Sequence, residues 1–404
     1  MKVLHILYQS LPQISGSSIR SRDILMSQKE IGLNPIAVTS PFQSGTNNEE
    51  IIDGIRYLRT SINGSETISD EQKSLLTRIF RFFKILSFYQ NLKQIVNAEK
   101  PDVLHAHAMF VCGLPAILIG KKYNIPVVYE VRSLWMLKKK GKKGWMDLLT
   151  EKILFGIELY VMRKAALVVA INHYLKNELI IQKIDEAKIA VIQNAVNTTL
   201  IDTLKQKTRN HCLSEPKLKF GYIGTLTPHE GVDFLIEVFA NLNKEICNAE
   251  LYIFGKGVEE PKIRAMSEKF ENVTFKGSLE PENIHKAFEL INIIVNPRYK
   301  NKLTDSVTPL KPLEAMAYEK IVIGSDVEGI KELITDKFNG LLFEAGNPSD
   351  LLNVMKYALK IESETRRHLL KNALQYVYDE KSWLKNATKY QLIYTELLMN
   401  KNAN

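Results

Sequence analysis

The chain has 404 residues, 45% of them apolar, which is enough for two α/β domains. A net charge of +9 predicts anionic partners such as phosphates, nucleic acid or an anionic membrane. The three cysteines are scattered without metal-ligand spacing and fit a reducing cytosol. Met1–Gln9 lacks the features of a signal peptide, and no apolar run approaches the roughly 20 residues that cross a bilayer. We therefore expect a cytoplasmic protein.

The first half of the chain alternates predicted strands with predicted helices. A polar turn is expected at 11–20, a helix at 21–33 and a long helix from about 71 to 97. Buried strands are expected at 2–8, 35–40, 54–60, 102–108, 126–132, 166–172 and 189–195. Apolar, β-branched strands separated by helices predict a parallel, doubly wound sheet. We assign residues 1–201 to this first Rossmann-like domain.

A polar segment at 202–216 is expected to link two domains. The alternation then begins again, with strands expected at 218–225, 250–257, 272–278, 291–297, 321–325 and 340–346. This pattern predicts a second doubly wound domain at 217–380, followed by a separate terminal helix at 381–404.

The strongest functional signal is the stretch Thr304–Glu319, TDSVTPLKPLEAMAYE, which lies between two buried strands. Pro309 and Pro312 stiffen the loop, and a short helix is expected after it with Glu314 in its first turn. Two hydroxyls and one ammonium stand just before that turn, on Ser306, Thr308 and Lys311. Such groups at a helix start suit a phosphate, and a glutamate there can bind sugar hydroxyls. An ordinary strand–loop–helix connection is an equal alternative.

This stretch resembles the nucleotide-sugar motif of the retaining glycosyltransferases of family four, in which two glutamates lie eight positions apart before an Ala-Met-Ala helix. Glu314 matches the second glutamate, which binds the donor ribose in that family, and Ser306 replaces the first. Three segments extend the resemblance to a subgroup associated with bacterial exopolysaccharide assembly and exosortase loci, namely HILYQSLPQISGSSIRSRDIL, YEVRSLW and IGTLTPHEG. In that subgroup the first glutamate is also replaced, and a Thr-Pro-Leu-Lys segment approaches the second.

The resemblance spans essentially the whole chain and implies the GT-B fold. In that fold two Rossmann-like domains face each other across a cleft, the first binding the acceptor and the second the nucleotide-sugar. The last helix is expected to cross back to the first domain.

The resemblance also assigns residues to the donor. Family members carry an arginine and a lysine that hold the diphosphate where this chain has Thr225 and Glu230. Lys311 and Arg298 flank the central motif and are expected to supply the missing charge. The full expected donor set is Gly16, Gly224, Thr225, Gly255, Arg298, Ser306, Thr308, Pro309 and Leu310. Tight turns without a ligand are the alternative at the glycines.

Polar residues also end two predicted strands of the first domain. His105 and His107 share one strand face, and His107 is nearer the carboxyl edge where ligands bind in open α/β sheets. The resemblance implies that His107 contacts the donor sugar, so we group it with Lys311 and Glu314 as catalytic. Glu130 and Arg132 are assigned to acceptor or sugar recognition, with a structural ion pair as the alternative. Arg20 and Arg22 lie early in the first helix, an unfavourable place for cations without a nearby anion.

We expect no cofactor and no metal site, because no Asp-x-Asp pair or ligand cluster is visible. The basic, aromatic helix Ser74–Val96 and the lysine-rich loop Leu137–Trp145 suit an anionic lipid surface. A helix with one core face and one solvated charged face is the alternative.

These observations predict a metal-independent, retaining glycosyltransferase at the inner face of the cytoplasmic membrane. It would move a sugar from a nucleotide-diphospho-sugar to a surface polysaccharide or a lipid-linked glycan. One alternative is another GT-B enzyme, such as a nucleotide-sugar epimerase or a glycogen-type synthase. A basic nucleic-acid-binding protein is the other, but no binding motif supports it, so no nucleic acid is expected as a partner.

Overall fold

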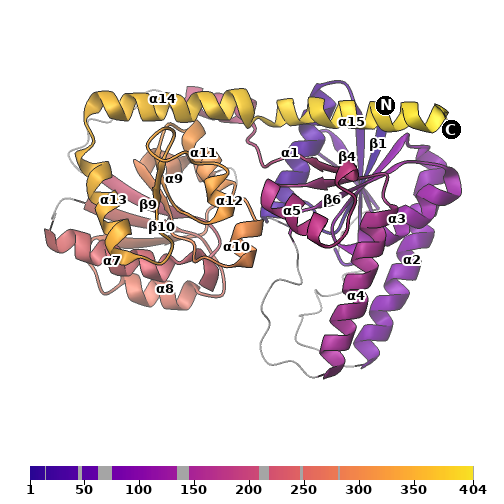
Figure 1. Ribbon diagram of the computed structural model, residues 1–404, viewed down its shortest axis with the longest axis horizontal. Helices are drawn as coiled ribbons and strands as arrows, with labels where there is room; N and C mark the ends of the chain where they lie inside the picture. Colours follow the sequence, from indigo (N-terminus) through magenta and orange to yellow (C-terminus); the bar gives the residue numbers. More distant parts are fainter. Residues whose placement is uncertain are drawn as a thin grey trace. The chain divides into compact units, whose positions relative to one another are not determined.

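The computed structural model describes residues 1–13, 15–43, 48–61, 75–133, 145–208, 218–245, 249–280 and 283–403. They form two compact units, one made of residues 1–193 with 383–404 and the other of residues 194–382. Each unit is built around one sheet (Figure 1). The prediction of two Rossmann-like domains is confirmed.

The first unit contains an eight-stranded sheet in the order β3-β4-β2-β1-β5-β6-β7-β8. Its strands are β1 (Lys2–Leu7), β2 (Asn34–Thr39), β3 (Glu49–Ile52), β4 (Ile55–Arg59), β5 (Val103–His107), β6 (Val127–Val131), β7 (Leu167–Ala170) and β8 (Ile189–Val191). The helices are α1 (Gly16–Glu30), α2 (Leu75–Glu99), α3 (Phe110–Tyr123), α4 (Trp145–Lys164), α5 (His173–Ile181) and α15 (Trp383–Ala403), with a 3₁₀ turn η2 (Glu186–Lys188). The described strands pair in parallel, apart from β3 with β4 at one edge.

The second unit contains a parallel six-stranded sheet in the order β11-β10-β9-β12-β13-β14. The strands are β9 (Leu218–Ile223), β10 (Ala249–Phe254), β11 (Val273–Gly277), β12 (Ile293–Asn296), β13 (Ile321–Ser325) and β14 (Leu341–Phe343). The helices are α6 (Thr198–Thr208), η3 (Pro228–Glu230), α7 (Val232–Glu245), α8 (Glu260–Ser267), α9 (Ile284–Leu290), α10 (Lys302–Ser306), α11 (Lys311–Ala317), α12 (Glu328–Lys331), α13 (Pro348–Lys360) and α14 (Ser363–Glu380).

Both sheets bury side chains on their two faces. In β12, Ile293 and Val295 belong to one apolar cluster and Ile294 to another. Successive residues of a strand point to opposite faces, so each sheet is covered on both sides. A parallel sheet covered in this way leaves only the ends of its strands for a ligand.

Three elements differ from the sequence prediction. Helix α1 begins at Gly16 rather than at 21, because Ser15 and Ser18 form a capping box that starts the helix early. Strand β3 was not predicted, since its sequence EEII is short and lies at an exposed edge. Residues 302–306 form helix α10 within the expected loop, with Asn301 capping its first turn.

The units divide at Asn194 and Ser382 rather than at the predicted 201, 217 and 380. Asn194 Nδ2 donates to Thr308 O at 2.5 Å, and Val196 N donates to Lys381 O at 2.8 Å. These bonds fix the segment before α6 to the second unit. Helix α15 packs against α1 in the first unit (Figure 1).

Three predicted features lie wholly or partly outside the described residues. They are the lysine-rich loop, of which only residue 145 falls in a described range, the start of the basic helix before residue 75, and the linker from residue 209 onward. The predicted linker at 202–208 is instead the second half of helix α6. Among the described helices, none combines enough length and apolar character to span a membrane.

Candidate functional site

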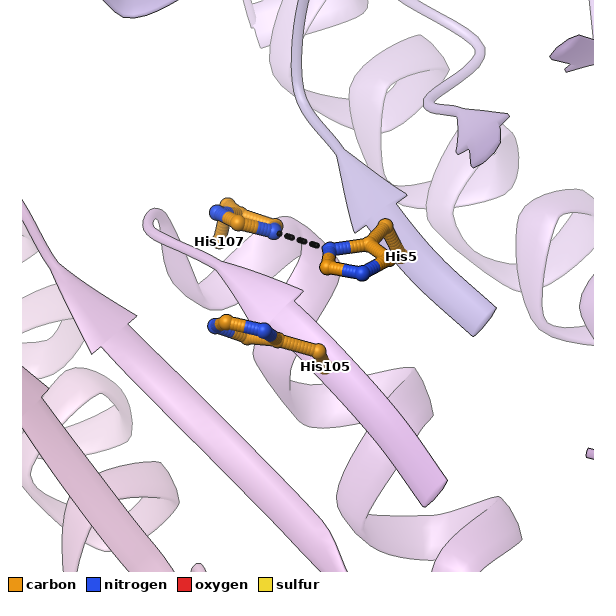
Figure 2. Close-up of side chains that lie close together, drawn as sticks. All are labelled: His5, His105 and His107. Atoms are coloured by element: carbon orange, nitrogen blue, oxygen red, sulfur yellow. Dashed lines mark hydrogen bonds between the residues drawn. The ribbon is translucent and has the colours of Figure 1, made fainter. Parts of the chain in front are cut away.

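A buried polar cluster lies at the carboxyl ends of three neighbouring strands in the first unit. His5 of β1 pairs in register with His105 of β5, and His107 pairs with Glu130 of β6. Figure 2 shows the three imidazoles close together, with His5 and His107 joined by a hydrogen bond. The three rings and the carboxylate are 0 to 2% exposed. Buried titratable groups at this edge are a typical sign of a functional site.

Glu130 is held by two arginines and a tyrosine. Arg20 Nε donates to Oε1 at 3.0 Å and Arg132 Nε to the same oxygen at 2.8 Å, while Tyr390 of α15 donates a short hydrogen bond to Oε2. Burial alone would raise the pKa of Glu130, but the two arginines hold that pKa well below its usual range. Glu130 is the anion that makes a cation at Arg20 favourable. Arg22 finds its own partner in Asp23.

Of the two arginines that hold Glu130, Arg132 is the more accessible, with 11% of its side chain exposed. Its Nη1 donates to Ser17 O, Ser17 Oγ and Ser21 Oγ at 2.7 to 2.9 Å, and its Nη2 lies 2.6 Å from His107 Nδ1. Ser17 is exposed at the start of α1 beside Gly16, where an added Cβ would meet nothing within 4 Å. The structure therefore brings Gly16, His107, Glu130 and Arg132 to one edge of the first unit.

In the second unit, Glu230 is paired with Arg298. The guanidinium donates to both carboxylate oxygens, at 3.0 and 2.9 Å, and to Val307 O at 2.7 Å. Gly231 allows this approach, because an added Cβ would lie 2.1 Å from Pro297 O and its φ of +68° suits glycine. Arg298 and Lys311 were expected to supply the positive charge that the loop with Thr225 and Glu230 lacks. In the structure Arg298 pairs with Glu230 itself.

The central motif holds a second ion pair. Lys311 Nζ lies 2.6 Å from Glu314 Oε2, and these side chains are 30% and 19% exposed. Ser306 and Thr308 are buried, and Ser306 Oγ donates to Leu303 O at 3.0 Å. Pro309 and Leu310 connect this buried part to α11, with Leu310 at its N-cap. The motif therefore presents an accessible ammonium and carboxylate, while its hydroxyls face inward.

The remaining donor candidates lie at the ends of β9 and β10. Gly224 N donates to Phe254 O at 3.0 Å, and a Cβ on Gly255 would lie 2.0 Å from Gly224 O. Thr225 accepts a hydrogen bond from the Tyr222 hydroxyl through its carbonyl. Close backbone approach alone is enough to require Gly255, and a Cβ on Gly224 would lie 2.5 Å from the Tyr222 hydroxyl.

Within the described residues, the three histidines are also spaced closely enough to hold a metal ion. No metal site was expected from the sequence, and neither His5 nor the tyrosines of α15 were predicted as site residues. Each ring already uses its acceptor nitrogen in a hydrogen bond: His107 with Arg132, His5 with His107, and His105 with Tyr394. A cation would displace these bonds and lie beside a guanidinium, so the donor set fits a metal poorly.

Comparison with known proteins gives matches in both halves of the chain. Residues 205–376 match the family model of glycosyl transferases group 1, and residues 65–200 match that of glycosyltransferase family 4. An uncharacterized glycosyltransferase of Methanocaldococcus jannaschii is 26% identical over 330 residues, which is 78% of this chain and 80% of that protein.

Two solved structures share the fold at low sequence identity. Sucrose-phosphate synthase from Thermosynechococcus elongatus superposes with a TM-score of 0.78 at 17% identity, covering 99% of each chain. HepE of Anabaena in complex with UDP-glucose superposes with a TM-score of 0.71 at 14% identity, covering 98% of this chain and all of that chain. These neighbours confirm the predicted GT-B architecture of the two units.

Proposed function

Since the chain belongs to the family-four glycosyltransferases with the GT-B fold, we propose that it transfers a sugar from a nucleotide-diphospho-sugar to a surface glycan, with retention and without a metal ion. The observation that carries the donor assignment is the accessible Lys311–Glu314 pair in the central motif. The motif's resemblance to the exopolysaccharide-associated subgroup supports the glycan acceptor.

On the donor side, Glu314 binds the ribose and Lys311 binds the diphosphate. Glu314 is partly exposed and already accepts a hydrogen bond, so its second oxygen can accept from sugar hydroxyls. Arg298 is occupied by Glu230 and Val307 O, which leaves Lys311 as the more exposed cation of the two. Negative charge grows on the diphosphate as it leaves, and an ammonium held beside it lowers that barrier. No protein base is assigned, because the departing phosphate oxygen can take the acceptor proton.

On the acceptor side, Arg132 contacts the acceptor and Glu130 holds Arg132 in position. Glu130 is fully buried with three hydrogen-bonded partners, so it holds Arg132 rather than touching a ligand. Both nitrogens of His107 are hydrogen-bonded in this structure, to Arg132 and His5. A direct contact between His107 and the donor sugar therefore requires one of these bonds to exchange.

An anionic membrane surface is the proposed docking partner, in keeping with a lipid-linked acceptor. Helices α2 and α4 both pack on α3 and carry apolar side chains facing solvent. These are Phe83 and Leu86 on α2 and Leu148, Leu149 and Ile153 on α4, which are 47 to 61% exposed. Exposed apolar side chains on a chain of net charge +9 suit a peripheral contact with anionic lipid.

The donor assignment can be tested by calorimetry with UDP-, GDP- and ADP-sugars. Glu314→Gln should weaken the binding of the preferred nucleotide while leaving the fold intact. Glu328→Gln is the matched control, because Glu328 forms the same kind of i,i+3 pair with Lys331 in α12. Equal nucleotide affinity in the Glu314 variant and its control would overturn the assignment.

Transfer itself is tested by product analysis with a lipid-linked acceptor in the presence of EDTA. We expect a product of the same anomeric configuration as the donor. Epimerised donor without transfer would instead support an epimerase. Tight, salt-dependent oligonucleotide binding with no nucleotide-sugar affinity would support a nucleic-acid-binding protein.

A further inference from the structure

The hydrogen-bond direction in the histidine cluster is fixed by Arg132. A guanidinium only donates, so His107 Nδ1, 2.6 Å from Arg132 Nη2, must be the acceptor. A neutral imidazole has one acceptor and one donor nitrogen, so His107 Nε2 carries the proton. That nitrogen lies 3.0 Å from His5 Nδ1, as drawn in Figure 2, and His5 Nδ1 is therefore an acceptor as well.

The same logic continues into α1. His5 Nε2 must carry a proton, and it donates to Gln28 Oε1 at 2.9 Å. The reverse orientation of the Gln28 amide would make His5 donate to His107, and His107 would then accept at both nitrogens. A neutral ring has a single acceptor nitrogen, so the amide orientation is fixed together with both tautomers.

The orientation of the Gln28 amide also determines the hydrogen bonds of Tyr394 on α15. Gln28 Nε2 donates to the Tyr394 hydroxyl at 3.0 Å, and that hydroxyl lies 2.7 Å from His105 Nδ1. His105 Nε2 lies 3.5 Å from Glu130 Oε2 and has no hydrogen-bond partner of its own among the described residues. A proton on Nε2 faces this carboxylate favourably, so Nδ1 is the acceptor and the Tyr394 hydroxyl donates to it. Glu130 accepts from Arg132 Nε, so the chain of contacts closes into a ring.

We propose that this ring makes Gln28 and Tyr394 positioning residues, which keep His5, His105 and His107 as neutral Nε2–H tautomers and thereby hold Arg132 at the accessible edge of the sheet. The proposal rests on the proposed function only for its activity readout. Its members lie on five different elements, β1, β5, β6, α1 and α15, and meet Arg132 just after β6.

The surrounding charges agree with three neutral rings. His5 faces His105 and His107 from β5, Gln28 from α1, and the Glu130 and Arg132 charges from the β6 end. The pKa of His5 and that of His107 are lowered well below the usual value, mainly by burial and secondly by the neighbouring His105. Burial also lowers the pKa of His105. Protonated His107 would direct an N–H at the Arg132 N–H, which is repulsive.

The tautomers can be read directly by ¹⁵N NMR on protein labelled at histidine. Wild-type protein should show three buried rings with the proton on Nε2, assigned through single His→Gln variants. A ring in this cluster with its proton on Nδ1 would overturn the proposal. Zinc alone should leave these signals unchanged near neutral pH, and their replacement by metal-bound signals would show a metal site instead.

Gln28→Glu tests the positioning role. A carboxylate at this position favours doubly protonated His5, whose Nδ1–H would then force His107 to accept at Nε2 and give up its bond from Arg132. As the pH falls, His107 should shift to the Nδ1–H tautomer. At the same pH the KM for the acceptor should rise roughly tenfold or more, because one charge-assisted hydrogen bond to Arg132 is lost. At higher pH, where His5 is neutral, both effects should reverse.

Gln43→Glu is the matched control, because Gln43 is equally buried in the same unit but bonds to Ser10 and Leu11 outside the ring. Tyr394→Phe is a second variant, which should perturb the His105 signal. Tyr129→Phe should not, because Tyr129 is equally buried but its hydroxyl donates to Glu158, outside the ring. If Gln28→Glu leaves His107 as Nε2–H, or shifts it without changing acceptor KM, the positioning role is wrong. Failure of wild-type protein to transfer any sugar would contradict the proposed function, and the NMR result would still decide the ring.

Discussion

Arg298 and Glu230 form a bidentate ion pair in the second unit, with both side chains about one-tenth exposed, at 9% and 11%. Arg298 also donates to Val307 O, so this one side chain connects the end of β12, the η3 turn and the loop before α11. Glu230 stands where the resemblance led us to expect a lysine. The loop after β9 therefore keeps a cation beside it, supplied by Arg298 from the end of β12.

Removing the cation of this pair should destabilise the second unit. Arg298→Ala leaves Glu230 as a nearly buried carboxylate without its partner, at an expected cost of about 3–5 kcal/mol in the free energy of unfolding. Urea unfolding followed by circular dichroism measures this change. The double variant Arg298→Met, Glu230→Gln should be less destabilised than Arg298→Ala alone. A single variant as stable as wild type would show that the pair is not buried in solution.

Replacing Glu230 with lysine should make the melting temperature depend more strongly on bound nucleotide. Glu230→Lys places an ammonium beside the Arg298 guanidinium, so the melting temperature should fall in the absence of ligand. A bound diphosphate would neutralise the two cations, and UDP or the preferred nucleotide should stabilise this variant more than it stabilises wild type. Equal nucleotide-dependent shifts in both proteins would place Glu230 away from the diphosphate.

Lys311→Ala should lower turnover by roughly 10²-fold or more, with a smaller effect on donor affinity. The ammonium matters most when charge has developed on the leaving diphosphate, so kcat is expected to change more than binding. Lys331→Ala removes the equivalent cation of the Glu328 pair and should change neither quantity. If Glu230→Lys faces the same phosphates, it should partly restore turnover to the Lys311→Ala enzyme. Near-normal turnover after Lys311→Ala would move the role to Arg298.

The sequence predicted most of the fold because strands buried on both faces form continuous apolar runs. Strand β12 and the motif after it were recognised in this way. Short elements were missed when their formation depends on a cap or on an edge position, as in α10 and β3. Periodicity carries little information over four or five residues.

The candidate site was predicted only where residues end their own strands. His107, Glu130 and Arg132 could be placed at one edge because neighbouring parallel strands end together. Tyr390 and Tyr394 share a helix face by their spacing of four, but the sequence gives no sign of which strands that face meets. Arg298 was named as a cation for the diphosphate, but its pairing with Glu230 was not predicted, because the sequence does not show that β9 and β12 are neighbours in the sheet.

Contact with membrane should depend on the apolar side chains at the start of α4. Leu149→Glu with Ile153→Glu adds two negative charges to this exposed surface and should abolish co-sedimentation with anionic liposomes. Leu392→Glu on α15 is the control, since Leu392 is 66% exposed on a different helix. Wild-type binding should increase with anionic lipid and decrease with salt. Equal binding to neutral and anionic vesicles would contradict the proposal that this surface binds anionic lipid.

Acid should destabilise the first unit through its three buried histidines. The pKa values of His5, His105 and His107 are lowered in the folded protein, so the unfolded chain binds up to three more protons once the pH falls below about 6.5. Acid stabilises the state that binds more protons, which here is the unfolded chain. The contribution of these histidines to the free energy of unfolding is therefore constant above this pH and falls below it. Three groups at about 1.36 kcal/mol per pH unit give a limiting slope of about 4 kcal/mol per unit.

The unfolding of the first unit can be followed by tryptophan fluorescence, because Trp383 is buried in it and the second unit, residues 194–382, has no tryptophan. Urea midpoints measured by fluorescence between pH 8 and pH 5 should fall only in the acidic part of this range. His105→Gln should lower the slope by about a third, whatever its effect at pH 8. Because its lowered pKa keeps His107 neutral in the folded protein, acceptor KM should stay unchanged where the loss of stability begins and should rise only at lower pH, when His107 itself is protonated and loses its bond from Arg132. A slope that is the same in wild type and His105→Gln would show that this ring is already protonated in the folded protein.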